Sequence, residues 1–158
     1  MAEPKRLFDI QLELLNTELK SIDGAIRQHD AIAMSVKNWA VVTWTASLGF
    51  SLKEPELRQF IGYTAVIPLV FWFVDGSFRR IQRSFIARVE QVSAYLNSNE
   101  FREAATTGTT VSIPLLSMRY RTKRFKDTLV GTMCFRSVSL LYLGLALCSL
   151  AAWALKHG

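Results

Sequence analysis

The sequence predicts an all-α integral membrane protein with three transmembrane helices, a long N-terminal amphipathic helix and a cytoplasmic helical extension. Three observations lead to this fold class. Apolar blocks without a charged residue occupy residues 38–52 and 137–155, and a third occupies 60–74. A heptad pattern of apolar residues precedes the first block. Basic residues are concentrated between the second and the last block.

Residues 38–74 are expected to form a transmembrane hairpin. Each of its two apolar blocks has 15 residues, slightly fewer than the roughly 17–25 of a typical span. Lys37 and Lys53 can extend the first block, because their charged ends reach the headgroups while their stems stay in lipid. The charged segment 53–59, which contains Pro55, predicts a tight turn. The alternative is a buried hairpin in a soluble protein.

Residues 137–155 give the strongest membrane signal, with 19 residues and no charge between Arg136 and Lys156. The recurrence of Gly144, Cys148 and Ala152 predicts a helix-packing face. We expect Gly131 to break the helix before this span. The first residues lack the apolar run and cleavage site of a signal peptide, so the internal blocks are the expected anchors.

Basic residues set the expected orientation. Residues 75–136 carry eleven Lys or Arg and five Asp or Glu, whereas the turn 53–59 carries two of each. Because basic loops stay in the cytoplasm, we expect a multi-pass protein of the bacterial inner membrane with a cytoplasmic N-terminus. The net charge of +6 then reflects topology and gives little support for nucleic-acid binding.

Residues 1–37 are expected to form one amphipathic helix with a coiled-coil seam at alternating spacings of four and three. The seam either packs on the cytoplasmic helix of the same subunit or associates with copies of itself, and it would assemble or gate the protein. His29 on the seam is either a protonation switch or a polar residue that fixes register. The seam residues assigned to this role are Phe8, Leu12, Leu15, Leu19, Ile22, Ile26 and His29.

Hydroxyl residues in the first two spans have two possible roles: they let membrane helices pack closely, or they line a narrow pore. The candidate pore-lining residues are Thr43, Thr45, Ser47, Ser51 and Thr64. Asp75 ends the second span. It would form a charged ring at a pore mouth or pair with Arg79 one turn further on, and we favour the pair.

The basic cytoplasmic region 75–136 is expected to contain a helix over 77–103, a threonine-rich loop over 104–117 and a basic segment before the last span. The basic segment either contacts anionic lipid as a topology anchor or binds a phosphate-rich ligand. The candidate ligand-binding residues are Arg79, Arg80, Arg83, Arg119, Arg121, Lys123 and Arg124. The sequence has no phosphate-binding glycine loop, nucleophile–base pair or metal-ligand spacing, so we expect neither an enzyme nor a cofactor or metal.

The long N-terminal helix, membrane hairpin and helical cytoplasmic extension resemble the small SLATT-like transmembrane effectors of bacterial antiphage defence, with residues 37–39 and 71–80 as the most suggestive stretches. Among these it is similar to the channel effectors of the Hailong system. The resemblance implies an oligomeric channel controlled by a nucleotide or oligonucleotide signal, with a nucleotidyltransferase partner. The third span departs from the simplest two-span pattern.

From these patterns we expect a homo-oligomeric ion channel, a tetramer in the simplest case, that depolarises the inner membrane when a signal or partner releases it. Oligomerisation is required because three short helices cannot enclose a polar path alone. The alternatives are a non-conducting membrane adaptor that recruits a cytoplasmic partner and a holin-like lysis protein.

Overall fold

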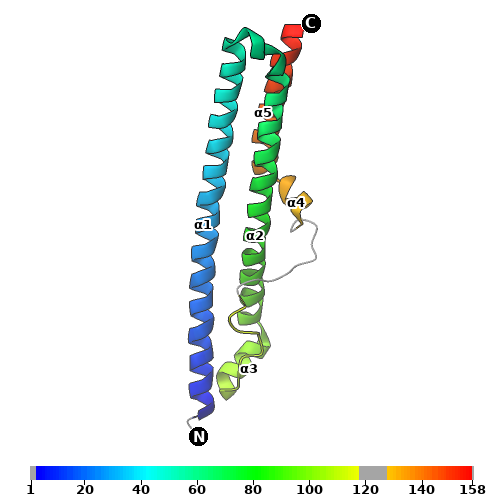
Figure 1. Cartoon of the computed structure of the whole chain (residues 1–158). Helices are drawn as coiled ribbons and strands as arrows, with labels where there is room; N and C mark the ends of the chain where they lie inside the picture. The colour runs from blue at the N-terminus through cyan, green and yellow to red at the C-terminus, as the bar shows by residue number, and fades with distance from the viewer. Residues whose placement is uncertain (1–2, 118–127, 158) are drawn as a thin grey trace. The chain divides into compact units, whose positions relative to one another are not determined.

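The computed structural model describes residues 3–117 and 128–157, and these residues form helices joined by short connections (Figure 1), with no strand among them. The all-α expectation is therefore confirmed for this part of the chain. The basic segment at 118–127 lies outside the described residues.

The first helix, α1, runs without interruption from Glu3 to Lys53. It joins the predicted amphipathic helix to the first apolar block, because no proline separates them and the residues at the junction continue the helical pattern. Lys53 lies in the last turn, where a positive charge interacts favourably with the helix dipole.

The segment after α1 is longer than the expected tight turn. A 3-10 helix, η1, covers Pro55–Ala65, and the α-helix α2 follows over Val66–Leu96. Two prolines account for this arrangement: Pro55 lies at the start of η1, and Pro68 lies in the first turn of α2. Since a proline ring clashes with the carbonyl four residues earlier, α-helical geometry cannot extend upstream through Pro68. The second apolar block thus begins as a 3-10 helix.

The predicted helix over 77–103 is interrupted at Asn97 and Ser98. The Asn97 side chain donates to the Ser93 carbonyl at 2.8 Å, which satisfies an end carbonyl of α2. Ser98 then caps a new helix, α3 (Asn99–Thr107), by accepting from the Phe101 amide at 3.2 Å. Helix α3 ends at Gly108, whose φ of 70° is the left-handed conformation that favours glycine.

Two further helices follow the basic segment. Helix α4 covers Leu129–Met133 and α5 covers Arg136–His157. Thr128 caps α4 by accepting from the Gly131 amide at 3.1 Å. Gly131 therefore lies inside α4, and the helical path is interrupted later, between Met133 and Arg136. The expectation that Gly131 itself breaks the helix is wrong.

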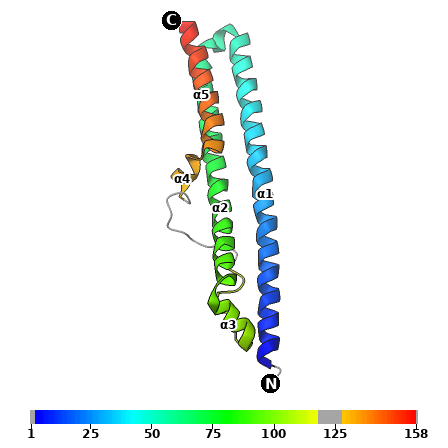
Figure 2. The ribbon, with the colours of Figure 1, turned by 180° about the vertical axis from the view of Figure 1, so that it is seen from behind.

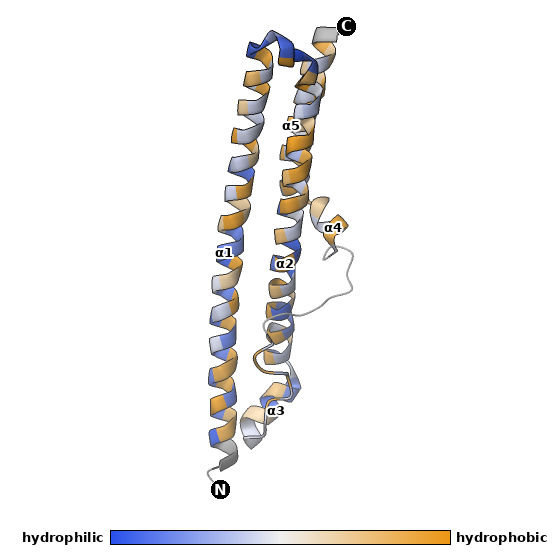
Figure 3. Ribbon diagram, in the orientation of Figure 1, coloured by the Kyte–Doolittle hydropathy of each residue, from blue (hydrophilic) through white to orange (hydrophobic). Residues whose placement is uncertain are grey.

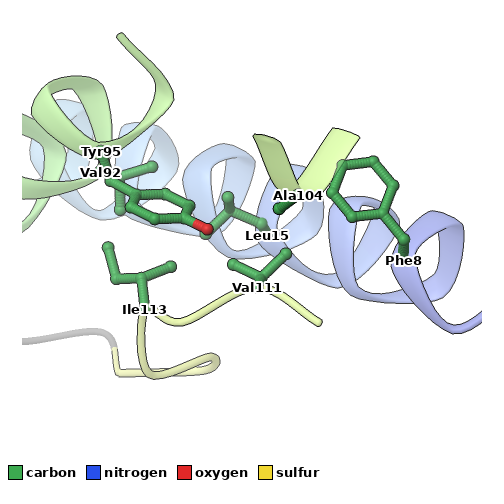
Figure 4. Close-up of a cluster of buried hydrophobic side chains, with 7 residues drawn as sticks. All are labelled: Phe8, Leu15, Val92, Tyr95, Ala104, Val111 and Ile113. Carbon is green, nitrogen blue, oxygen red and sulfur yellow. The ribbon is translucent and has the colours of Figure 1, made fainter. Parts of the chain in front are cut away.

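The chain divides into two compact units. The first comprises Met1–Gln28 and Ile81–Lys123, and the second comprises His29–Arg80 and Arg124–Gly158. The first unit encloses a hydrophobic core to which α1, α2, α3 and the segment after α3 contribute (Figure 4). Its buried members are Phe8, Leu15, Val92, Tyr95, Ala104, Val111 and Ile113.

The second unit brings α5 beside α2 in both views of the ribbon (Figures 1 and 2). Its core contains Ala40 of α1 together with Val138 and Tyr142 of α5, and Phe71 and Trp72 of α2 pack against them. Hydrophobic residues cover much of α5 and the adjoining part of α2 (Figure 3). Three stretches of the chain, each far from the others in sequence, therefore share this core.

Within the described residues, two helical stretches are long and apolar enough to cross a membrane, Pro55–Leu96 and Val138–Leu155. Only 22% of the residues in the most apolar window of each are buried inside the chain. A core helix of a soluble protein buries most of such a window. Helix α1, which contains the predicted first span, is not one of these two.

Candidate functional site

The predicted seam on α1 faces the rest of the first unit, but with a different register. Phe8, Leu15 and Ile22 are buried, and Phe8 and Leu15 pack with residues of α2 and α3. Leu12, by contrast, is 37% exposed, whereas Glu18 is only 1% exposed. The inward face of α1 thus contains a charged residue that the apolar spacing did not identify.

Glu18 forms a buried ion pair with Arg88 of α2. The guanidinium donates to both carboxylate oxygens, at 2.8 Å from Nε and 3.3 Å from Nη2. The same carboxylate accepts from the Leu116 amide at 2.8 Å, and Arg88 also donates to the carbonyl of Pro114 and to Gln91. Because both charged groups are almost completely buried, each compensates the other for the water contacts that it lacks in the core.

The segment after α3 is held against the first unit by further polar contacts. The Val111 amide donates to Gln11 Oε1 of α1 at 2.7 Å, and the Ser112 amide donates to the Tyr95 hydroxyl of α2 at 3.3 Å. The loop predicted over 104–117 is shorter than expected, because its first four residues belong to α3. In the remaining segment, the amides of Val111 and Ser112 are occupied by side chains of the helices. This arrangement leaves these two amides unavailable to an external ligand.

An open groove of about 540 Å³ lies on the first unit. Leu12, Leu15, Leu19 and Leu96 supply its apolar surface. Its polar lining is Asp9, Glu13 and Asn16. The groove therefore combines exposed Leu12 and partly buried Leu19 of the predicted seam with Leu15 of the core.

The second unit contains a buried charge cluster around Asp75, whose side chain has no exposed surface. Lys37 Nζ of α1 lies 3.7 Å from Asp75 Oδ2, and Arg79 Nε of α2 lies 3.9 Å from Oδ1. The Tyr142 hydroxyl of α5 donates to Oδ2 at 3.2 Å. Arg79 also contacts Asp30 of α1 at 3.2 Å. We name these five residues the Asp75 cluster.

The predicted pair of Asp75 with Arg79 is thus one of several contacts in the Asp75 cluster. Sequence spacing indicated this partner because the two residues are one helical turn apart. Lys37 and Tyr142 were missed because they lie 38 and 67 residues from Asp75 along the chain. No local pattern connects them. Lys37, expected to reach the headgroups, is directed at a buried carboxylate.

A second polar contact within this unit joins Trp44, Thr64 and Ser149. The Trp44 indole N–H donates to Ser149 Oγ at 2.8 Å, and the hydroxyls of Thr64 and Ser149 are 2.9 Å apart. Ser149 is completely buried. This contact was not predicted, because a serine in an apolar helix has no specific sequence signature and its partners are distant in the chain.

The candidate pore-lining residues do not share one environment. Ser51 and Thr64 are buried inside the second unit, and Thr64 also donates to the Ile61 carbonyl at 2.7 Å. Thr43 and Ser47 are half-buried, and Thr45 is exposed. Thr45 shares its face of α1 with exposed Asn38 and Gly49, where an added Cβ would meet no atom within 4 Å.

The sequence predicts a small-residue packing face on α5 that includes Gly144. A Cβ added at Gly144 would meet no atom of the described residues within 4 Å. Cys148 on the same face is exposed. Helix α5 instead directs Val138, Tyr142 and Ser149 inward. The predicted packing face is therefore open in the single chain.

The candidate ligand-binding residues do not share one environment either. Arg79 belongs to the Asp75 cluster, Arg80 is exposed, and Arg83 is half-buried in the first unit. The remaining four candidates, Arg119, Arg121, Lys123 and Arg124, lie outside the described residues. His29 is half-buried, with its ring centroid 6.2 Å from that of Phe78.

Among the described residues, no group of three His, Cys, Asp or Glu side chains is arranged to hold a metal ion. On the exposed face of α1, the Asp23 carboxylate accepts a hydrogen bond from Arg27 and raises the pKa of that guanidinium.

No family model matches this chain, and searches of curated proteins and of solved structures find no similar protein.

Proposed function

We propose that this protein is a homo-oligomeric ion channel of the bacterial inner membrane, with the second unit inserted in the bilayer through three spans and the N-terminus in the cytoplasm. The observation that carries this proposal is an uncharged exposed strip on α1, made of Asn38, Val42, Thr45 and Gly49, which faces away from the chain's own core. On a membrane helix, such a strip is suited to contact water or another copy.

An ion path through a single copy is not supported by the packing. The space between the three helical stretches of the second unit is occupied by Ala40, Tyr142 and their apolar neighbours. The hydroxyls of Thr64 and Ser149 are engaged with each other. A path lined by the exposed strip therefore needs several copies around a common axis. The open face at Gly144 and Cys148 supplies a second surface on which copies can pack.

The proposal narrows the set of pore-lining residues. Thr45 is the candidate whose side chain is exposed on the strip, whereas Ser51 and Thr64 stabilise the chain's own packing. The proposed signal is a phosphate-bearing nucleotide or oligonucleotide, made by a nucleotidyltransferase partner. Exposed Arg80 and the four basic residues at 119–124 are the groups available to bind it.

Substituted-cysteine accessibility tests the pore assignment. In a Cys134→Ser, Cys148→Ser background, we expect Thr45→Cys to react with a charged thiol reagent and the reaction to reduce ion flux, because Thr45 would face water. Leu147→Cys is the matched control, since Leu147 is 64% exposed on apolar α5 and would face lipid. Thr45→Cys that stays unreactive in an ion-conducting preparation would refute the assignment.

The adaptor remains the second candidate because of the groove on the first unit. Its leucine floor and its polar lining of Asp9, Glu13 and Asn16 are the features of a helix-binding groove. Membrane potential separates the two functions: an adaptor leaves it unchanged on expression, whereas a released channel dissipates it. Entry of propidium together with depolarisation would instead indicate holin-like lesions.

A further inference from the structure

The Asp75 cluster joins three helices through one carboxylate. Asp75 of α2 is completely buried, and the Lys37 and Arg79 side chains are only 15% and 23% exposed. Tyr142 of α5 is completely buried as well and donates its hydroxyl to the same carboxylate. Asp75 is thus the one residue among these that contacts α1, the next turn of α2 and α5 at the same time.

The formal charges of the cluster balance while the Asp75 carboxylate is in place. Lys37 and Arg79 supply two positive charges, and Asp75 and Asp30 supply two negative charges. Asp30 contacts Arg79 and is 55% exposed, so its effect is weakened by solvent. Without the Asp75 carboxylate, two partly buried cations on α1 and α2 would face each other, and their repulsion would favour separation of the helices.

Separation at this level would act on the proposed pore strip. Lys37 directly precedes Asn38 in α1, and Thr45 lies seven residues further along the same face. Because a helix moves as a stiff element over two turns, a displacement of Lys37 would displace the strip as well.

We propose that Asp75 is a charge latch that holds α1, α2 and α5 in the closed packing, and that loss of its negative charge opens the ion pathway. The proposal rests on the proposed channel function. The latch and a purely structural role of Asp75 predict opposite changes in conductance when this residue is substituted. Substitution of a purely structural residue would lower the conductance of the protein, because less protein folds. Substitution of a latch residue would raise the conductance in the absence of any signal.

The test compares purified full-length variants in liposomes by potassium flux without added ligand. Asp75→Asn keeps the shape of the side chain and removes its charge, and we expect flux per inserted protein to rise about tenfold. Lys37→Met combined with Asp75→Asn removes the excess positive charge and should return flux to within about threefold of the original protein.

Ser149→Ala is the matched control. It also removes an interhelical hydrogen-bonding group of α5, but it changes no charge, so flux should stay at the original level. Provided that at least one variant conducts potassium, Asp75→Asn with flux at or below the original level, in protein that is inserted and monodisperse, would overturn the latch. Equal leakage from Asp75→Asn and the double variant would also overturn it.

A conformational readout separates failure of the latch from failure of the channel. Spin labels on Cys148 and on Thr45→Cys, in a Cys134→Ser background, report the separation of α5 and α1. The latch predicts longer or broader distances in Asp75→Asn and recovery in the double variant, whether or not ions flow. Unchanged distances would refute the latch. Changed distances without flux in any variant would refute the channel and retain the latch.

Discussion

Replacing Glu18 with Gln is expected to loosen the first unit, because it leaves the Arg88 guanidinium in the core without its counter-charge. Arg88 is 1% exposed and keeps only its contacts with Gln91 and Pro114 among those described here. Breaking a buried ion pair by removing one partner costs about 3–5 kcal/mol. Glutamine retains one acceptor oxygen for Arg88 or the Leu116 amide, so we expect a loss near the lower end, about 3 kcal/mol.

Amide hydrogen exchange of the full-length protein in nanodiscs measures this loss locally. A decrease of about 3 kcal/mol in opening free energy corresponds to exchange that is faster by roughly two orders of magnitude. The effect should appear in peptides that contain Val111 and Leu116, whose amides are bonded to side chains of α1. Glu13→Gln is the control, because Glu13 is exposed on the same helix and should change exchange little.

A double variant distinguishes the ion pair from simple packing. Glu18→Leu with Arg88→Met removes both charges and keeps apolar volume, and we expect it to lie within about 1 kcal/mol of the original stability. If the exchange rate of Glu18→Gln remains within about threefold of the original protein, the reasoning is refuted. A buried guanidinium that has lost its carboxylate should cost more free energy than such a small change allows.

Two further substitutions test close packing and backbone conformation. Gly76→Ala should displace α4 from α2, because the new Cβ would lie 2.5 Å from Met133 Cγ. We expect the free energy of unfolding to fall by about 1–3 kcal/mol and Cys134 to be alkylated faster. Gly49→Ala is the control and should show neither effect, because its new Cβ meets no atom within 4 Å. Gly108→Ala places a Cβ at a φ of 70° and should lower the melting temperature in detergent through a loss of about 1–2 kcal/mol; an unchanged melting temperature would show that the α3 end relaxes freely.

Helical structure could be predicted from the sequence more completely than helix contacts could. The apolar and heptad patterns identified α1 as one continuous helix and α5 as an apolar helix, because both patterns are local and repeat over many residues. The 3-10 helix over Pro55–Ala65 was not predicted. Its cause is the spacing of two prolines, one of which lies outside the expected turn.

The register of α1 shows why the remaining contacts could not be predicted. An a/d pattern gives the apolar side of a helix, but Glu18 is buried because Arg88, 70 residues away in sequence, supplies its partner. The same holds for Asp75 with Tyr142 and for Trp44 with Ser149, at separations of 67 and 105 residues. A polar residue appears surface-like until its distant partner is known, and Glu18 is such a residue on α1.

The contacts of Tyr142 and Ser149 also impose an order on biosynthesis. The ribosome adds 67 residues between Asp75 and Tyr142, which takes about 3–13 s at ordinary elongation rates. During that interval the Asp75 carboxylate and the Trp44 indole have no α5 to contact, although α1 and α2 have already emerged. Nascent chains that stall in this window would carry an incomplete hydrogen-bonding arrangement around Asp75 and Trp44. Such intermediates are natural substrates for chaperones and for proteases.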